Sequence, residues 1–260
     1  MEVLNPYNPS NKLVTKENIQ GFLSDVGINS FTINNLVLYQ TAFVHKSYCP
    51  IKEYEDYENT CNALPLQTSS YERMEFLGDA ILESVVCSYL YKRFHIIHKQ
   101  NEGFLTKLKI RLVQGSHLCE LSRNMKLQEY IILSNQTEQS DQGRENDNIL
   151  EDIFEAFVGA IYLDHSYEVA EKCIIAIIET YVDFTDMLLI DTNFIDQINR
   201  YIKRTYDVYP QHKITKVGSK YSCSVIVNGE EITKGVGDSK KKAEQNSSRN
   251  ALIKYNVITK

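Results

Sequence analysis

Apolar residues recur at helical spacing along most of the first 187 residues. No run before about residue 210 alternates between apolar and polar residues, so we expect this part of the chain to be entirely helical. The first 15 residues and residues 134–148 are polar, and we expect both segments to be loosely held. The apolar spacing predicts helices over residues 16–38 with a stop at Gly27, 36–44, 71–94, 102–113, 116–124, 127–133, 148–163 and 167–185.

The pattern changes after residue 193. An amphipathic helix is predicted at 194–206, and a last helix is predicted from Lys240 to Tyr255. The pair Asn228-Gly229 predicts a tight hairpin between two of the three strands that lie between these helices, at 213–217, 221–227 and 231–236. The fold class is therefore an all-α domain followed by a small α+β domain with the order α-β-β-β-α. We expect these domains at 1–187 and 194–260, with a linker at 188–193.

Two of the predicted helices carry carboxylates on one face. Glu72, Glu75 and Asp79 are three and four residues apart in the first helix, and Asp152 and Glu155 are three apart in the second. Like charges at these spacings repel each other. A row of carboxylates on a helix that must pack is also costly unless something cationic lies against it.

Both helices are otherwise apolar, and each contains a glycine close to its acids. Gly78 is unfavourable in a helix interior, which indicates close approach by a neighbour. Two apolar helices that face each other with paired acids can hold hard divalent cations, and magnesium binds a few carboxylates while it keeps several waters. One such acid pair more often lines the solvated edge of a core helix. Two pairs in two glycine-containing helices favour the metal site.

The net charge of −6 conceals an asymmetry between the two predicted domains. From residue 190 onward there are 13 Lys and Arg against 7 Asp and Glu, whereas residues 1–189 have 15 against 27. An acidic body with a basic C-terminal part fits a metal site beside a module that binds a polyanion.

The remaining composition narrows the class of protein. Six cysteines are scattered without a C-x-x-C pair and no signal peptide is recognisable, so we expect free thiols in a reducing, cytoplasmic compartment. No apolar run reaches membrane-spanning length, which predicts no membrane association. The six histidines lack zinc-ligand spacing, so we predict no zinc site and no small-molecule cofactor.

Several segments together resemble one known family. Residues 72–82, Glu-Arg-Met-Glu-Phe-Leu-Gly-Asp-Ala-Ile-Leu, closely resemble the ribonuclease III motif. Residues 152–160 resemble that family's second acidic motif, 42–48 resemble a segment before the first motif, and 102–113 resemble the segment between the two. The α-β-β-β-α order at 194–260 resembles a double-stranded RNA-binding domain, which reads A-form shape and phosphates. The likeness covers nearly the whole chain.

The resemblance implies a magnesium-dependent endoribonuclease that cleaves double-stranded RNA by two-metal phosphodiester hydrolysis. Manganese is expected to substitute for magnesium. Asp79 and Glu155 would be the indispensable catalytic acids, and Glu72 and Glu102 would be supporting acids that line the RNA cleft. The metal ligands that it implies are Glu75, Asp79, Asp152 and Glu155.

One catalytic domain cuts one strand, so cleavage of a duplex requires two chains. The resemblance implies a homodimer in which Phe76 would pack into the partner, and ordinary core is the alternative for this residue. The implied products are short duplexes with 3′ overhangs, 5′-phosphate ends and 3′-hydroxyl ends.

The chain departs from the family at a few positions. Asn199 and Arg200 stand where related domains tend to have glutamine and glutamate, and loop 217–220 lacks the expected histidine, which predicts weaker or altered RNA binding. Tyr71 replaces the asparagine usual before the motif, and residues 49–70 form an acidic, tyrosine-rich insertion. The RNA-binding residues that the likeness implies are Asn199, Arg200 and the lysines at the start of the last helix, Lys240, Lys241 and Lys242, where a helix N-terminus also attracts phosphate.

Two other functions are weighed against the nuclease. A non-catalytic protein that binds or sequesters double-stranded RNA would be expected to lack one or more of the central acids, and all four are present. A helical carboxylate oxidase needs Glu-x-x-His pairs, and neither acidic helix contains one.

Overall fold

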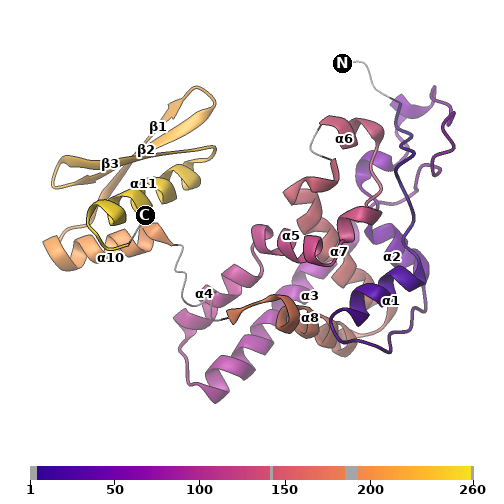
Figure 1. Ribbon diagram of the computed structural model, residues 1–260, viewed down its shortest axis with the longest axis horizontal. Helices are drawn as coiled ribbons and strands as arrows, with labels where there is room; N and C mark the ends of the chain where they lie inside the picture. Colours follow the sequence, from indigo (N-terminus) through magenta and orange to yellow (C-terminus); the bar gives the residue numbers. More distant parts are fainter. Residues whose placement is uncertain (1–4, 141–142, 185–192, 259–260) are drawn as a thin grey trace. The chain divides into compact units, whose positions relative to one another are not determined.

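The structure is a computed structural model that describes residues 5–140, 143–184 and 193–258. The chain divides into two compact units, Met1–Met187 and Leu188–Lys260, which are described here one at a time (Figure 1). The linker predicted at 188–193 lies outside the described residues except for Asn193. Within the described part of the chain, no helix is both long and apolar enough to cross a membrane.

The first unit is helical, which confirms the predicted class. The described part of this unit has no strand longer than a single bridge, between Val44 and Ile132. Five short helices complete it, namely η1 (Lys46–Tyr48), η2 (Lys52–Tyr54), the π-helix η3 (Tyr91–Ile97), η4 (Leu127–Tyr130) and η5 (Gly143–Glu145). The α-helices are α1 (Lys16–Ser24), α2 (Leu36–Ala42), α3 (Glu72–Leu90), α4 (Glu102–Leu112), α5 (Gly115–Asn124), α6 (Asn135–Ser140), α7 (Asp147–Asp164) and α8 (Tyr167–Tyr181).

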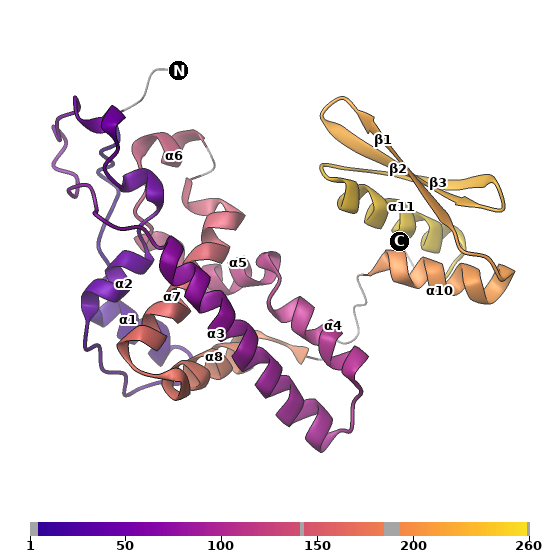
Figure 2. The same ribbon diagram turned by 180° about the vertical axis from the view of Figure 1, so that it is seen from behind.

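Helix α7 forms the centre of this unit. Its residues from Ile153 to Ile161 are buried almost without interruption, because helices lie on several sides of it. It packs against α2, α3, α5 and α8, and both views show α3 running beside it (Figures 1 and 2). A helix that is apolar all round needs such a central place. Glu155, the one charged residue within this buried stretch, is therefore held close to protein on more than one side.

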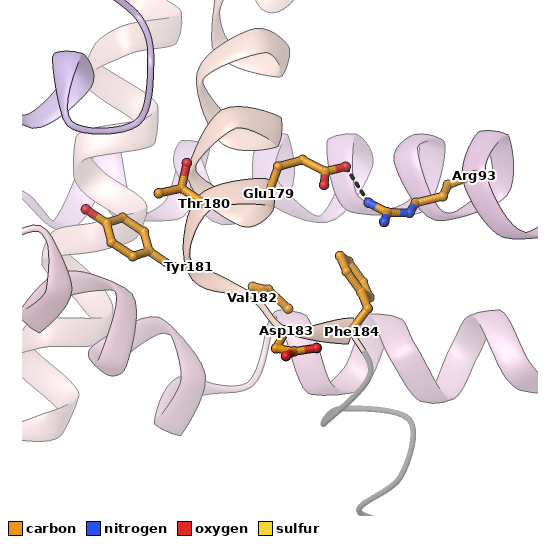
Figure 3. A pocket seen from close by; sticks show the side chains of 7 residues that line it. All are labelled: Arg93, Glu179, Thr180, Tyr181, Val182, Asp183 and Phe184. Carbon is orange, nitrogen blue, oxygen red and sulfur yellow. Dashed lines mark hydrogen bonds and ion pairs between the residues drawn. The ribbon is translucent and has the colours of Figure 1, made fainter.

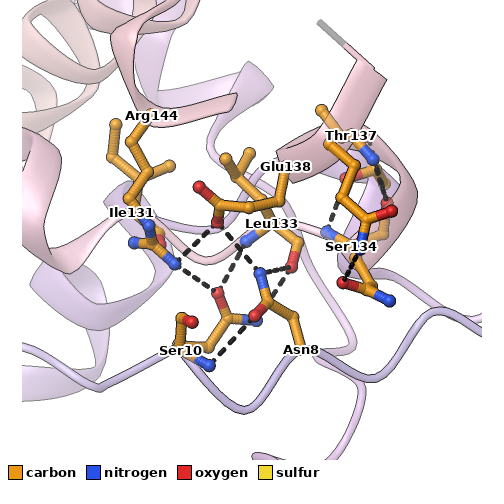
Figure 4. A network of polar contacts seen from close by, with 12 residues as sticks. Asn8, Ser10, Ile131, Leu133, Ser134, Thr137, Glu138 and Arg144 are labelled. Atoms are coloured by element: carbon orange, nitrogen blue, oxygen red, sulfur yellow. Dashed lines mark hydrogen bonds and ion pairs between the residues drawn. The ribbon is translucent and has the colours of Figure 1, made fainter. Parts of the chain in front are cut away.

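The described part of the polar N-terminal segment is held by buried asparagines, contrary to the prediction from its composition. Asn8 and Asn11 are only 2% and 8% exposed. The Asn11 side chain donates to Leu133 O at 2.9 Å and accepts from Leu133 N at 3.1 Å. Asn8 donates to Glu138, which pairs with Arg144 at 3.0 Å, as Figure 4 shows. Buried polar groups must be hydrogen-bonded, and these buried asparagines satisfy the main-chain N–H and C=O of Leu133.

The insertion at 49–70 is anchored to the two residues that precede its start. The Tyr54 hydroxyl donates to Ser47 O at 3.2 Å. The Tyr48 hydroxyl donates to Leu64 O at 2.7 Å, and Gln67 N donates to Tyr48 O at 3.0 Å. A small apolar cluster of Val44, Tyr48 and Ile132 takes up side chains from Leu64 and Leu66. Most of residues 55–62 are exposed, so the middle of the insertion forms a surface loop.

A shallow hollow lies where the C-terminal end of α8 meets η3. Arg93 of η3 pairs with Glu179 of α8, and the Phe184 ring lies 4.6 Å from the Arg93 guanidinium carbon (Figure 3). The other lining residues are Thr180 to Asp183. None of the predicted site residues lines this hollow. The Arg93–Glu179 ion pair in it attaches η3, which continues α3, to α8.

The second unit has the predicted α+β order, which confirms the second half of the fold class. Helix α10 (Phe194–Tyr206) is followed by β1 (Gln211–Val217), β2 (Lys220–Val227), β3 (Glu230–Gly237) and α11 (Lys240–Lys254). The sheet is antiparallel with the order β1-β2-β3. Asn228 and Gly229, with φ of 52° and 83°, make the tight turn that pairs Val227 with Glu230. The core of this unit consists of Ile198, Ile202, Val225, Val227, Ala251 and Leu252.

Candidate active site

Helices α3 and α7 cross with their backbones in contact, and two glycines make this crossing. A Cβ atom on Gly78 would lie 1.8 Å from the Glu155 carbonyl oxygen, and one on Gly159 would lie 2.3 Å from the Met74 carbonyl oxygen. Any side chain at either position would force the helices apart. The acids one turn from these glycines, Glu75 on α3 and Glu155 on α7, are therefore brought to the same crossing.

Glu155 is the most perturbed acid at the crossing. It is 9% exposed. Burial raises its pKa to about 8, and the nearby charges of Asp79, Glu151, Glu75 and Asp152 act in the same direction. Its strongest charged neighbours are thus all acids, which indicates a cluster of carboxylates that needs either a proton or a cation.

The other three central acids belong to the same cluster. Burial is the largest cause of a raised pKa for Glu75, Asp79 and Asp152. The charges of Asp152 and Asp79 also raise the pKa of Glu75. The structure thus brings together the four acids Glu75, Asp79, Asp152 and Glu155, taking two from each helix.

Two lysine–glutamate pairs stand beside the cluster. Lys46 Nζ lies 3.0 Å from Glu72 Oε1, and this hydrogen bond lowers the pKa of Glu72. Lys109 Nζ of α4 lies 3.0 Å from Glu83 Oε1, and the Lys109 charge acts on Asp79. The Lys46 charge also acts to lower the pKa of Glu75 and Asp152. Neither lysine is among the groups that act on Glu155.

Asp152 has an uncharged partner. Tyr71 is 2% exposed, and its hydroxyl donates to Asp152 Oδ2 at 2.8 Å. This hydrogen bond lowers the pKa of Asp152, but burial outweighs it and the net direction is upward. The same contact, with burial as the larger cause, raises the pKa of Tyr71 well above its ordinary range.

The donor set of the cluster suits a hard divalent cation. It consists of carboxylate oxygens only, which magnesium and manganese prefer, and its acids are held by two rigid helices. As the side chains stand, no three carboxylates, histidines or cysteines in the described ranges converge on one point as a formed metal site. After burial, the charges of neighbouring acids also raise the pKa of Glu155 and Glu75, and a bound cation would offset that repulsion.

The supporting acids occupy different places. Glu72 lies beside the cluster, because its charge acts on Glu75 and Asp152. Glu102 begins α4 and accepts a hydrogen bond from Thr106 of the same helix at 2.8 Å, so its position in an RNA cleft stays a prediction. His45 caps η1, because its Nδ1 accepts from Ser47 N at 3.2 Å.

Two further acids near the cluster were missed from the sequence. The charge of Glu151 acts on Glu155. The Glu151 side chain also lies against Gly115 at the start of α5, where an added Cβ would be 2.0 Å from Glu151 Oε2. Glu83 acts on Asp79 from the next turn of α3. Glu151 precedes Glu155 by four residues, and Glu83 follows Asp79 by four. This helical spacing could have predicted that both lie beside the central acids.

Phe76 is not part of the monomer core. Its side chain is 81% exposed on the turn of α3 that also carries Glu75. The alternative that it is an ordinary core residue is therefore wrong. A contact with a second chain stays a prediction that this exposure supports.

The predicted RNA-binding residues of the second unit lie on its surface. Lys240, Lys241 and Lys242 are exposed in the first turn of α11, whose N-terminus Ser239 caps. Lys242 is partly engaged, because it lies 3.3 Å from Asp238. On α10, Arg200 is exposed and lies 3.1 Å from Asp196. Asn199 is half-buried beside it.

Comparison with known proteins identifies both units. Residues 35–181, more than half of the chain, match the Ribonuclease-III-like family. The chain belongs to the ribonuclease III family. Residues 194–255 match the double-stranded RNA binding motif. This ribonuclease III family member is thus an endoribonuclease with a double-stranded RNA-binding motif, as the two sequence motifs predicted.

Relatives extend this likeness over most of the chain. It is 31% identical to Ribonuclease 3 of Borreliella afzelii, over 91% of both chains. It is 32% identical to a putative protein of Paramecium bursaria Chlorella virus 1, over 95% of this chain and 82% of the other. Among solved structures, the nuclease domain of ribonuclease III from Campylobacter jejuni aligns with a TM-score of 0.50 at 25% identity. That alignment covers 65% of this chain and 97% of the other.

Proposed function

We propose that this family member is a magnesium-dependent homodimer that hydrolyses both strands of double-stranded RNA. The products would be short duplexes with 3′ overhangs, 5′-phosphate ends and 3′-hydroxyl ends. The observation that carries the proposal is the meeting of Glu75, Asp79, Asp152 and Glu155 at the Gly78–Gly159 crossing. Divalent-metal dependence is also general in the ribonuclease III family.

The four acids would hold the cations, with Asp79 and Glu155 indispensable. Magnesium or manganese, when bound, supplies a more acidic water and positive charge for the phosphate oxygens. Glu155 must release its proton to take part, because its pKa is about 8 in the absence of a cation. Asp79 and Glu75 stand on a continuous helix, so they would be held in place without loop closure.

The basic unit would hold the RNA. Lys240 and Lys241 are exposed at the N-terminus of α11, where lysine charge and the helix dipole both favour phosphate. Asn199 and Arg200 on α10 are the candidates for a second contact. Recognition of this kind follows backbone shape and charge, so we expect preference for duplex over single-stranded RNA.

The homodimer would supply one set of acids for each strand. Phe76 is the proposed contact, since it is a large exposed apolar side chain on the helix that carries Glu75 and Asp79. Because Phe76 lies one residue from Glu75, the contact between chains would be next to the acids.

The test is cleavage of a long labelled duplex RNA by wild type and by Glu155→Gln. The substitution keeps the size of the side chain and removes the charge, so we expect cleavage to fall at least about 1,000-fold. Duplex binding should remain within about twofold, because Lys240 and Lys241 are untouched. Glu168→Gln, an exposed acid in the first turn of α8, is the matched control and should cleave normally.

The outcomes separate the possible functions. Magnesium-dependent cutting of duplex RNA by wild type, stopped by EDTA, would support the nuclease. Full cleavage by Glu155→Gln would contradict the metal assignment. Shifted but uncut RNA with wild type in magnesium would favour a protein that only binds duplex RNA.

A further inference from the structure

Tyr71 precedes α3 and reaches across to Asp152 on α7. The geometry points to Tyr71 as a positioning residue that orients the Asp152 carboxylate for cation binding. This inference rests on the proposed function, because it assigns a partner to one of the acids that would hold magnesium. It concerns a side chain that lies outside the row of acids and that the family resemblance does not explain.

The tyrosine is fixed at both ends. Its backbone N–H donates to Val44 O at 2.8 Å, and its hydroxyl donates to Asp152 Oδ2 at 2.8 Å. The ring between them is buried and lies 5.8 Å from the ring of His45. A buried ring with both ends bonded has little freedom, so the hydroxyl presents a fixed point to the carboxylate. Asp152 Oδ2 is held by this bond, which leaves Oδ1 for a cation.

The side chain of Tyr71 is not used to cap its own helix. Tyr71 is the N-cap residue of α3, and its side chain makes no capping hydrogen bond. Asparagine is the residue that the family resemblance leads us to expect there. This chain uses asparagine caps elsewhere, and Asn35, Asn101 and Asn146 each accept from the backbone of their own helices. Those three asparagines have extended backbones, whereas Tyr71 has a helical backbone with φ of −69° and ψ of −20°, so its side chain is free of a capping role and is directed at Asp152.

The chemistry of the donor fits this role. The charge of Lys46 acts on Asp152 from its ion pair with Glu72, but Lys46 is bonded to Glu72. A lysine or arginine bonded directly to Asp152 would neutralise its charge and oppose binding of a metal cation. A tyrosine hydroxyl at neutral pH stays protonated and donates without adding charge. Hydrogen bonds from such outer partners orient metal-binding side chains, and their loss commonly weakens metal affinity by about 10–100-fold.

The chain contains a matched control at the other end of α7. Tyr39 is fully buried, and its hydroxyl donates to Asp164 Oδ2 at 3.0 Å. Asp164 is the last residue of α7 and accepts from Asn34 N and Asn35 N, so its role is structural. Tyr39→Phe and Tyr71→Phe therefore remove the same kind of bond from the same helix, and only Tyr71 contacts one of the four central acids.

The experiment measures Mn²⁺ binding by the full chain without RNA, using electron paramagnetic resonance of the free ion. For Tyr71→Phe we expect binding about tenfold weaker than wild type. The magnesium concentration for half-maximal duplex cleavage should rise by the same factor, with the rate at saturating magnesium within a few-fold of wild type. Tyr39→Phe should bind Mn²⁺ as wild type does. Circular dichroism verifies that both variants are folded.

Two further results decide the inference. In an Asp152→Asn background, Tyr71→Phe should produce no additional loss of Mn²⁺ affinity, because the bond that it removes no longer positions a carboxylate. Equal Mn²⁺ affinity for Tyr71→Phe and wild type, or equal losses for Tyr71→Phe and Tyr39→Phe, would overturn the inference while leaving the nuclease intact. Absence of any Mn²⁺ binding or cleavage by wild type would overturn the proposed function and this inference with it.

Discussion

The two units place charge in opposite ways. In the helical unit, like charges on α3 and α7 are pressed together at a buried crossing, and the pKa of Glu155 rises to about 8. In the C-terminal unit, like charges on Lys240 to Lys242 are spread on an exposed first turn of α11. The first arrangement exists only through tertiary packing, whereas the second needs only one helix and its cap.

This difference has consequences for stability. A buried carboxylate such as Glu155, with other carboxylates close to it, opposes folding until a proton or a cation binds. Exposed lysines at a helix N-terminus are repelled by the positive end of the helix dipole, but solvent and salt screen this repulsion, so its cost to folding is small. The helical unit should therefore be sensitive to packing, pH and cations, and the C-terminal unit should be sensitive to salt.

Removing the crossing should give the largest effect. Gly78→Ala places a Cβ 1.8 Å from the Glu155 carbonyl oxygen, so α3 and α7 must separate. We expect a loss of more than about 3 kcal/mol in the free energy of unfolding of the helical unit, with unfolding of the C-terminal unit unchanged. Chemical denaturation followed by circular dichroism and by RNA binding would report on the two units separately.

The control for this change is another helical glycine. Gly21 in α1 has no atom within 4 Å of an added Cβ, so Gly21→Ala should stabilise the protein by roughly 0.5–1 kcal/mol. If Gly78→Ala were as well tolerated as Gly21→Ala, the contact between the two helices would be wrong, and the arrangement of the acids with it.

The second effect is a fall in the stability of the helical unit as pH rises. The C-terminal unit should show the opposite direction, because burial lowers the pKa of His212. Folded Glu155 keeps its proton up to pH about 8, whereas the unfolded chain releases it near the ordinary value of 4.5. The folded state thus binds more protons through this window, and stability must fall as pH rises from about 5 to 8. We expect a loss on the order of 2 kcal/mol in EDTA, most of it recovered on adding magnesium at pH 8.

Thermal unfolding against pH checks this expectation. Glu155→Gln has no proton to release, so its curve should be flatter and its EDTA form should be more stable than wild type at pH 8. Glu168→Gln should keep the slope of wild type. A flat curve for wild type in EDTA would show that the carboxylates are not crowded.

The smallest effect concerns the C-terminal unit. Replacing Lys240 and Lys241 by alanine should weaken duplex binding by about tenfold and reduce the dependence of log K on log salt by about 2, because two phosphate contacts are lost. Arg249→Ala, an exposed cation further along α11, is the control. Lys242→Ala should act more weakly, since Lys242 already lies near Asp238. Equal effects at Arg249 and at Lys240 and Lys241 would mean that only net charge matters.

Much of the fold could be predicted from the sequence because the relevant signals are local. Apolar spacing located most of the α-helices, and Asn228-Gly229 located the β2–β3 turn. The spacing of Glu75 with Asp79, and of Asp152 with Glu155, predicted one acidic face on each of two helices. Gly78 predicted a close neighbour, and the structure identifies that neighbour as the backbone of α7.

The rest depended on contacts between distant segments. Nothing near Tyr71 in the sequence indicates that its hydroxyl reaches Asp152, 81 residues away. Polarity alone misrepresented the N-terminal segment, because a buried asparagine that bonds to main chain has the same composition as one in water. Lys46 and Lys109 were likewise not predicted as partners of Glu72 and Glu83, since each pair is 26 residues apart.

The Asn11 amide imitates a peptide group. It offers one donor and one acceptor to Leu133, as a neighbouring strand would, so both main-chain polar groups of Leu133 are hydrogen-bonded. The autonomous folding unit is therefore larger than the region by which the family is recognised, which begins at residue 35. A fragment trimmed to that region would expose Leu133 and the apolar cluster around Tyr48, and we expect it to aggregate.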